Sequence, residues 1–309
     1  MRKIASCLRT YVHEDYERSL YLKEALFLVV LISINYTIGL EDRIIDAWIG
    51  NPIRIVWYFL LYATAYYGAL LIWARHTGQM QIFRNRRVWL YSLFGMAVLG
   101  WDGGFYGYQA WSKELFGGQI YWFAFYGLSN LSSLLTIFMP LTLFYFLADD
   151  RSTRFYGLFK AQNVSPYLML LAAMLPLVMW ASFQPDFLRT YPSYRDSAAD
   201  EFFGVAPWVT ALAFELFYGF DFISTELLFR GFLIIGMAHL LGRGALLPMV
   251  VCYASLHFGK PLGETIGSVF GGYILGVIAL QSRSVWGGIL VHVGIAWAME
   301  LAAWVQLSR

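Results

Sequence analysis

Long apolar runs, separated by short polar stretches, extend along most of the chain. A helix that crosses a bilayer needs roughly 20 mostly apolar residues. Runs of this kind occur near residues 25–40, 55–74, 88–107, 120–147, 166–184, 206–222, 226–241, 245–258, 265–281 and 285–305. Because several of these runs are short or paired, the pattern predicts an all-α polytopic membrane protein, a helical bundle with about eight transmembrane helices.

The composition agrees with this pattern. Hydrophobic residues make up 59% of the chain and charged residues only 14%, whereas a soluble domain carries about 25% charged residues. The polar stretch before the first apolar run holds five basic residues, Arg2, Lys3, Arg9, Arg18 and Lys23. Such a start is unlike a cleavable signal peptide, so we expect a retained membrane segment behind an amphipathic basic arm.

Basic and acidic connections alternate between the predicted helices. The stretch 75–87 carries four arginines and no acid, and 151–160 carries three further cations. Acidic residues gather instead in 41–46 and 186–201. Since positive charges favour the cytoplasmic side, we expect a cytoplasmic N-terminus, in the inner (plasma) membrane of a bacterium. The net charge of +2 gives no reason to expect nucleic acid as a partner.

Three regions follow from this organisation: a cytoplasmic basic arm at 1–24, N-terminal transmembrane helices at 25–165, and a C-terminal catalytic core at 166–309. In the second region, the glycine-rich stretch around Asp102 predicts a broken helix or an interfacial loop, with Asp102 exposed or capping a helix. The longest polar connection, 184–204, either covers a membrane-facing cavity or serves as a linker.

The segment FISTELLFRGFL, residues 222–233, holds two opposite charges in apolar surroundings. Glu226 and Arg230 are four residues apart, which places them on one face of a helix that we expect to extend from 207 to 241. Charged groups inside a bilayer are costly and usually face a protein interior or a watery cavity, which makes them functional candidates. A buried ion pair of this kind can also serve only to fix helix packing.

Two histidines downstream complete a candidate catalytic site. His257 ends one apolar run, and His292 lies near the start of the last one. A carboxylate beside a neutral imidazole can deprotonate a water and return the proton to a leaving amine, while a second imidazole donates to the oxyanion. In this scheme Arg230 keeps Glu226 ionised. Glu226, His257 and His292 can equally hold a divalent metal such as zinc, and the sequence does not separate the two versions.

Three motifs carry a family resemblance: TELLFRGFL, then YASLHFGKP, then GGYILGVIALQSRSVWGGILVHVGIA. In this order they resemble the CPBP intramembrane proteases, relatives of the type 2 CAAX prenyl protease (Ras- and a-factor-converting enzyme) and of Abi-like bacteriocin-processing and immunity proteins. The resemblance covers about residues 206–305 and implies an intramembrane endopeptidase with a membrane-associated peptide or protein as its substrate. Matched position by position, the family's functional residues are Glu226, Arg230, Tyr253, His257 and His292.

Two positions depart from the family pattern. Thr225 stands where the family has its first, water-activating Glu, and Ala296 stands where it has the Asn assigned to the oxyanion. Because a hydroxyl is a poor general base at neutral pH, Glu226 would take over this role, with Glu264 or Glu300 as a further carboxylate. The alternative is a catalytically inactive pseudoprotease that acts as an immunity, scaffold or peptide-binding membrane protein. A transporter is disfavoured, because the two halves show no paired broken helices.

The last third of the chain also contains features that predict packing. Glycines four residues apart let helices approach closely, and they occur as the pairs Gly267/Gly271 and Gly272/Gly276. We expect Pro261 to end the helix that carries His257. Arg283, between the last two apolar runs, is expected to act as a topological anchor.

Overall fold

The computed structural model describes the chain apart from residues 1, 117, 161–162, 195–197 and 309. All regular elements of this described part are helices, so the predicted all-α class is confirmed. Six helical segments within it are long and apolar enough to cross a membrane: Arg18–Ile38, Ile53–His76, Gly118–Leu147, Pro207–Ser255, Leu262–Ser282 and Trp286–Leu307. The helix Ser165–Ala181 is apolar but shorter. The polytopic membrane bundle is thus confirmed, whereas the predicted number of spans is not.

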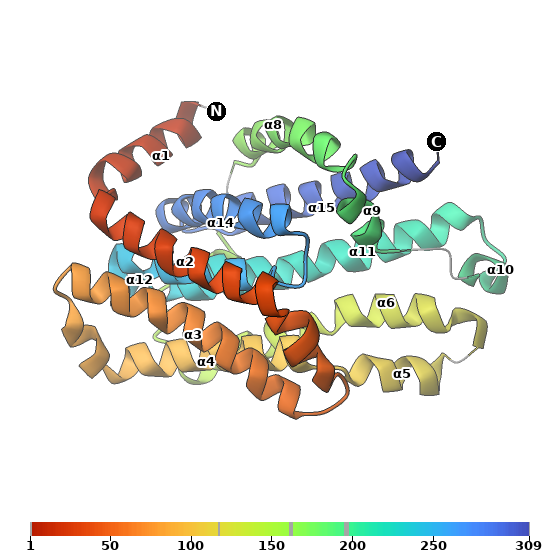
Figure 1. The fold of residues 1–309 in the computed structure, drawn as a ribbon, viewed down its shortest axis with the longest axis horizontal. Coiled ribbons are helices and arrows are strands. Elements are labelled where there is room, and N and C mark those ends of the chain that lie inside the picture. Colours follow the sequence, from red (N-terminus) through yellow and green to blue (C-terminus); the bar gives the residue numbers. More distant parts are fainter. Residues whose placement is uncertain (1, 117, 161–162, 195–197, 309) are drawn as a thin grey trace.

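The first half of the chain supplies long helices that run side by side along the longest axis of the molecule (Figure 1). These are α2 (Arg18–Ile38), α3 (Ile53–His76) and α4 (Arg86–Gly104), preceded by α1 (Arg2–Asp15). Local sequence sets their ends. Helix α2 stops at Gly39, whose φ of +66° suits glycine, and Asn85 caps α4 by accepting a hydrogen bond from the backbone N–H of Arg87.

The helix break predicted near Asp102 is present. Helix α4 ends at Gly104, and the chain continues as α5 (Gly107–Leu115), then returns as α6 (Tyr121–Leu131), π-helical η5 (Leu134–Phe138) and α7 (Met139–Leu147). Asp102 lies inside α4 and accepts a hydrogen bond from the hydroxyl of Thr136 in η5. The expectation of an exposed or capping Asp102 is therefore wrong, because this side chain links two helices.

The second half begins with α8 (Ser165–Ala181), α9 (Pro185–Thr190) and α10 (Ala199–Phe203). Helix α11 (Pro207–Glu226) then passes into π-helical η7 (Leu227–Gly236) and, after a turn at Met237, into α12 (Ala238–Leu241). The helical run predicted from 207 to 241 is thus present. After the short η8 (Gly242–Ala245) follow α13 (Leu246–Ser255), α14 (Leu262–Ser282) and α15 (Trp286–Leu307).

The centre of the molecule is η7, whose ten residues are all buried. Phe232 contacts the rings of Tyr91, Phe94, Phe144 and Tyr156, which come from α4, α7 and the loop after α7. Helices α13 and α14 cover other sides of η7. A π-helix is rare and often marks a functional site. Because protein surrounds η7, its charged Arg230 is shielded from lipid.

The predicted end of the His257 helix is wrong by a few residues. Helix α13 stops at Ser255, so His257 lies in the turn that follows, and Pro261 precedes α14. As a result Glu264 lies in the first turn of α14, a separate helix from the one that precedes His257.

The two glycine pairs of α14 differ in their surroundings. A Cβ on Gly272 would overlap the Tyr253 ring, and one on Gly276 would overlap Leu246 of α13, so this pair does bring helices close. At Gly267 and Gly271 a Cβ would meet no described atom within 4 Å. The packing role predicted for Gly267 and Gly271 is therefore wrong.

Candidate active site

A buried ion pair marks the junction of α11 and η7. Glu226 is the last residue of α11, and its Oε1 lies 2.9 Å from Nη1 of Arg230; both side chains are 0% exposed. The Arg230 guanidinium lies 4.0 Å from the centroid of the Tyr253 ring, a favourable cation–π contact. None of its nitrogens forms an aligned hydrogen bond with the described residues. Charge and ring contact therefore hold Arg230, and Glu226 is its only described counter-charge.

His292 of α15 is oriented from two sides. Its Nδ1 lies 2.9 Å from Glu226 Oε1, and its Nε2 lies 3.3 Å from the Tyr253 hydroxyl. Because an ionised carboxylate can only accept, we assign a proton to Nδ1. The ring of Phe222 packs against the imidazole at a centroid distance of 4.4 Å. The side chain of His292 is 15% exposed, so it is accessible where Glu226 is not.

His257 contacts the same tyrosine from the turn after α13. Its ring centroid lies 4.8 Å from that of Tyr253. Its Nδ1 lies 3.0 Å from the backbone carbonyl oxygen of Tyr253, and because a carbonyl only accepts, Nδ1 carries the proton in the neutral ring. Nε2 of His257 then keeps a free lone pair. The two histidines found in the sequence are therefore brought together around Tyr253, with the Glu226–Arg230 pair beneath them.

Gly288 of α15 makes room for Glu226. The second carboxylate oxygen, Oε2, has no hydrogen-bond partner among the described residues, and a Cβ at Gly288 would overlap it. Glycine is thus required here because the carboxylate lies directly against the backbone of α15. The sequence analysis did not single out this residue, although it lies four residues before His292 within the third motif.

Replacing Gly288 with alanine is expected to displace the Glu226 carboxylate from His292 and to lower the free energy of unfolding by about 1–3 kcal/mol, as overpacking does. Thermal unfolding in detergent measures this effect. Gly267→Ala is the matched control, since a methyl group there meets no described atom within 4 Å. Equal stability of the two variants would show that the carboxylate is not confined by α15.

The two positions that depart from the family pattern are both enclosed. Thr225 is 8% exposed and lies next to Glu226 at the end of α11. Ala296 is 4% exposed and lies one turn after His292 on α15. Thr225 has no carboxylate that could act as a base, and Ala296 has no amide that could donate to an oxyanion. Glu226 is the carboxylate that contacts His292.

The two further acids proposed from the sequence bind the 184–204 connection. The hydroxyl of Tyr191 donates to Glu264, at 3.0 Å to Oε2, and the backbone N–H of Ser193 lies 2.9 Å from both oxygens of Glu300. Burial raises the pKa of Tyr191 well above its usual value, so the phenol keeps the proton that it donates. Both carboxylates thus anchor this connection, at Tyr191 and Ser193, to α14 and α15.

The N-terminal helices hold the turn that carries His257. Asn35, 3% exposed at the end of α2, donates to the carbonyl oxygen of Phe258 at 3.0 Å. The hydroxyl of Tyr36 lies 2.6 Å from the carbonyl oxygen of Lys260, and Thr265 donates to that of His257. These contacts were not predicted from the sequence, which does not show which residue Asn35 contacts. They give the first half of the chain a direct part in positioning a site residue.

The side chains do not form a metal-ligand set in this arrangement. Glu226 Oε1 is already shared by Arg230 and His292, and a metal cation there would meet the guanidinium charge. Across the described residues, no group of three or more His, Cys, Asp or Glu side chains lies close enough to hold a metal ion. The zinc alternative therefore does not fit Glu226, His257 and His292 as they lie.

Fold and site together define a polytopic helical membrane protein with paired histidines over a buried Glu–Arg pair. Residues 199–298 match the family model described as type II CAAX prenyl endopeptidase Rce1-like. The match covers about a third of the chain, and the resemblance seen in the three motifs is confirmed by it. The match includes Glu226, Arg230, Tyr253, His257 and His292. No curated protein and no solved structure matched the chain in the corresponding searches.

Proposed function

We propose that the protein is an intramembrane endopeptidase that hydrolyses a peptide bond of a membrane-associated substrate. The observation that carries this proposal is the placement of two partly exposed imidazoles on Tyr253, one of them bound to Glu226. An imidazole with a free nitrogen and a second imidazole held by a carboxylate are the groups that water attack on a carbonyl requires. The Rce1-like match supports the same reaction class.

In this proposal His257 is the general base and acid. Its free Nε2 takes a proton from water while the water oxygen bonds to the scissile carbonyl carbon. When the tetrahedral intermediate collapses, the C–N bond breaks and His257 returns the proton to the leaving amine nitrogen. The products are a carboxylic acid and an amine, and no other reactant is needed.

The developing oxyanion would be stabilised by His292 and Tyr253. Glu226 accepts a hydrogen bond from the Nδ1–H of His292 and fixes the ring, so that a protonated Nε2 can donate to the oxyanion beside the Tyr253 hydroxyl. Glu226 is 0% exposed and acts in this scheme as a positioning residue, not as the base expected from the sequence. Arg230 supplies the counter-charge to its carboxylate.

The substrate is a peptide or protein segment that reaches the site from the bilayer. A type II CAAX prenyl endopeptidase acts by name on a prenylated CAAX sequence, and we extend this class to the present chain as a proposal. The aromatic side chains Phe214, Tyr218 and Phe222 follow one face of α11 from the 184–204 connection to His292. Phe214 is buried against Tyr194, whereas Tyr218 and Phe222 are partly exposed and supply apolar surface along which an extended chain could pack.

Proteolysis is tested by comparing new peptide termini in membranes of cells that express the unmodified protein or His257→Ala at equal abundance. We expect a set of termini that disappears with His257→Ala. His13→Ala is the matched control, because His13 lies exposed on the arm, and it should leave the termini unchanged. Termini that persist in His257→Ala would contradict the assignment of the base.

A second function, a peptide-binding pseudoprotease, is favoured by one observation: Thr225 and Ala296 replace two family groups at enclosed positions. In that case the unmodified protein produces no termini of its own. It would still retain membrane peptides on purification, and His257→Ala would retain them equally well. The termini comparison therefore separates the two functions.

Treatment with EDTA is expected to leave the rate of peptide hydrolysis unchanged, because the proposed reaction uses side chains alone. The measurement compares the purified protein before and after chelation, with the metal content determined in parallel. A rate that falls on chelation and returns with zinc would overturn the proposed roles of His257 and His292 and restore them as ligands.

We also propose a cytoplasmic N-terminus in a bacterial plasma membrane. The basic loops lie at one end of the bundle: Arg87 and His239 both approach Asp150, and Arg243 pairs with Glu14 of the arm. The acidic 41–46 segment instead lies by the His257 turn, where Glu41 packs against Gly259. This separation of charge supports the orientation given by the positive-inside rule.

A further inference from the structure

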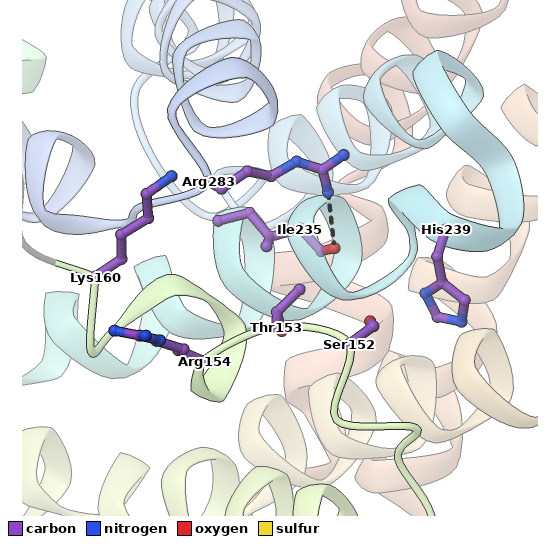
Figure 2. A pocket seen from close by; sticks show the side chains of 7 residues that line it. All are labelled: Ser152, Thr153, Arg154, Lys160, Ile235, His239 and Arg283. Atoms are coloured by element: carbon purple, nitrogen blue, oxygen red, sulfur yellow. Dashed lines mark hydrogen bonds between the residues drawn. The ribbon is translucent and has the colours of Figure 1, made fainter.

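A second polar site lies at the far end of α14 from Glu264. A cavity of about 460 Å³ is found where the loop before α8, the end of η7 and the end of α14 meet. Figure 2 shows Arg154 and Lys160 on the loop, Arg283 after α14, and Ile235 and His239 on the other side. None of the residues proposed for catalysis lines this cavity.

The cavity concentrates positive charge. Arg154, Lys160 and Arg283 carry permanent charges, and the hydroxyls of Ser152 and Thr153 add donors. No carboxylate is among the described residues that line it. The nearby Asp150 is paired with Arg87 and lies 3.6 Å from His239. Three cations that repel one another around one cavity favour the entry of an anion.

Helix capping explains two of the three cations. Lys160 Nζ donates to the carbonyl oxygen of Ser282 at 2.6 Å, and Arg283 Nη1 donates to that of Ile235 at 3.4 Å. Such contacts satisfy carbonyls at helix carboxyl ends and fix the two side chains in place. The side chain of Arg154 forms no hydrogen bond or ion pair with the described residues, although its backbone carbonyl oxygen accepts a hydrogen bond from the N–H of Gly157. Capping therefore leaves one charge of the cavity without a partner.

The cavity lies at the ends of apolar segments, where a membrane–water boundary is expected. It lies where the apolar segments Gly118–Leu147 and Leu262–Ser282 end and Trp286–Leu307 begins. Large aromatic side chains near it are exposed, namely Phe146, Phe159 and Trp286. The indole N–H of Trp286 donates to the carbonyl oxygen of Leu158 at 2.8 Å. Exposed aromatics with a polar anchor are typical of the headgroup level.

We propose that this cavity binds a phosphate group, presented by the headgroup of an anionic phospholipid. Guanidinium groups donate to phosphate oxygens in fixed pairs, and basic pockets between membrane helices take up such headgroups. Inorganic phosphate shares this chemistry but lacks acyl chains. The inference does not depend on peptide hydrolysis, because the cavity and the catalytic residues are separate.

The test measures binding of a fluorescent short-chain phosphatidic acid to the detergent-solubilised full chain. Arg154→Gln is expected to weaken binding about tenfold, the loss of one charge-assisted contact. Because Arg154 is exposed and its side chain has no hydrogen-bond or ion-pair partner among the described residues, this variant should keep the unmodified melting temperature. Arg86→Gln is the matched control: it removes one exposed arginine from the start of α4, away from the cavity lining, and should bind as the unmodified protein does.

Each outcome decides the proposal. Equal binding by the unmodified protein and Arg154→Gln, or equal losses in Arg154→Gln and Arg86→Gln, overturns it, and so does undiminished binding of a diacylglycerol without phosphate. If inorganic phosphate displaces the lipid, the phosphate group alone suffices for recognition. If it does not, the acyl chains contribute and the ligand is the phospholipid.

Discussion

In the purified protein, His257→Ala is expected to lower kcat for a cleaved peptide by about 10²- to 10⁴-fold, the usual contribution of a general acid–base group. KM should change little, because His257 acts on water and the leaving amine and not on the rest of the substrate. The physical reason is that Nδ1 faces the Tyr253 carbonyl at 3.0 Å, which leaves Nε2 as the free proton acceptor.

Two controls separate catalysis by His257 from a structural role. Alanine at 257 leaves the backbone contacts of Asn35 and Thr265 to this turn intact, so the melting temperature should be nearly unchanged. Added imidazole should restore part of the rate by occupying the vacated space. A large rise in KM with kcat preserved, or a fall in melting temperature that accounts for the lost activity, would show that His257 shapes the site without transferring a proton.

Glu226→Gln is expected to lower the free energy of unfolding by about 3–5 kcal/mol, the cost of leaving one member of a buried ion pair without its partner. Glu226 and Arg230 are both 0% exposed, and no nitrogen of Arg230 has an aligned hydrogen bond to another described group. An amide in place of the carboxylate therefore leaves the guanidinium charge uncompensated. Denaturant titration in mixed micelles measures the difference.

The matched control is the double variant Glu226→Gln/Arg230→Met, which removes the charge together with its partner. Methionine fills similar space against the Tyr253 ring, so most of the lost stability should return. If the double variant is no more stable than Glu226→Gln, the pair does not contribute through its charges. Glu226→Gln alone is in any case a poor test of catalysis, because lost activity and lost stability would coincide.

Membrane class, helix type and the Glu226–Arg230 pair could be predicted because they depend on local spacing. Apolar runs of bilayer length and a four-residue interval need no knowledge of distant segments. The end of the His257 helix was misplaced, because the turn after Ser255 is fixed by Asn35 and Tyr36 from α2, far away in sequence. The prediction of a packing role for Gly267 was also wrong, because residue spacing does not show which face of α14 meets another helix.

Only part of the candidate site could be predicted from the sequence. Glu226, His257 and His292 were visible as rare polar residues in apolar runs, and the motif order connected them to a family. The role of Gly288 and the contact of both histidines with Tyr253 could not be predicted, because each depends on the distance between helices. The basic cavity around Arg154 is assembled from the loop before α8 and the ends of η7 and α14, and its charges were explained from the sequence by topology alone.

By itself, the sequence determined that this chain is a helical membrane protein. It also identified the polar residues that are costly in a bilayer and are therefore functional candidates. Only the tertiary structure decided what those residues do to one another. It enclosed Glu226 and left His257 and His292 accessible, and it assigned Glu264 and Glu300 to the 184–204 connection. The reason is that hydropathy and helical spacing are properties of single segments, whereas protonation, access and partnership depend on atoms from different helices.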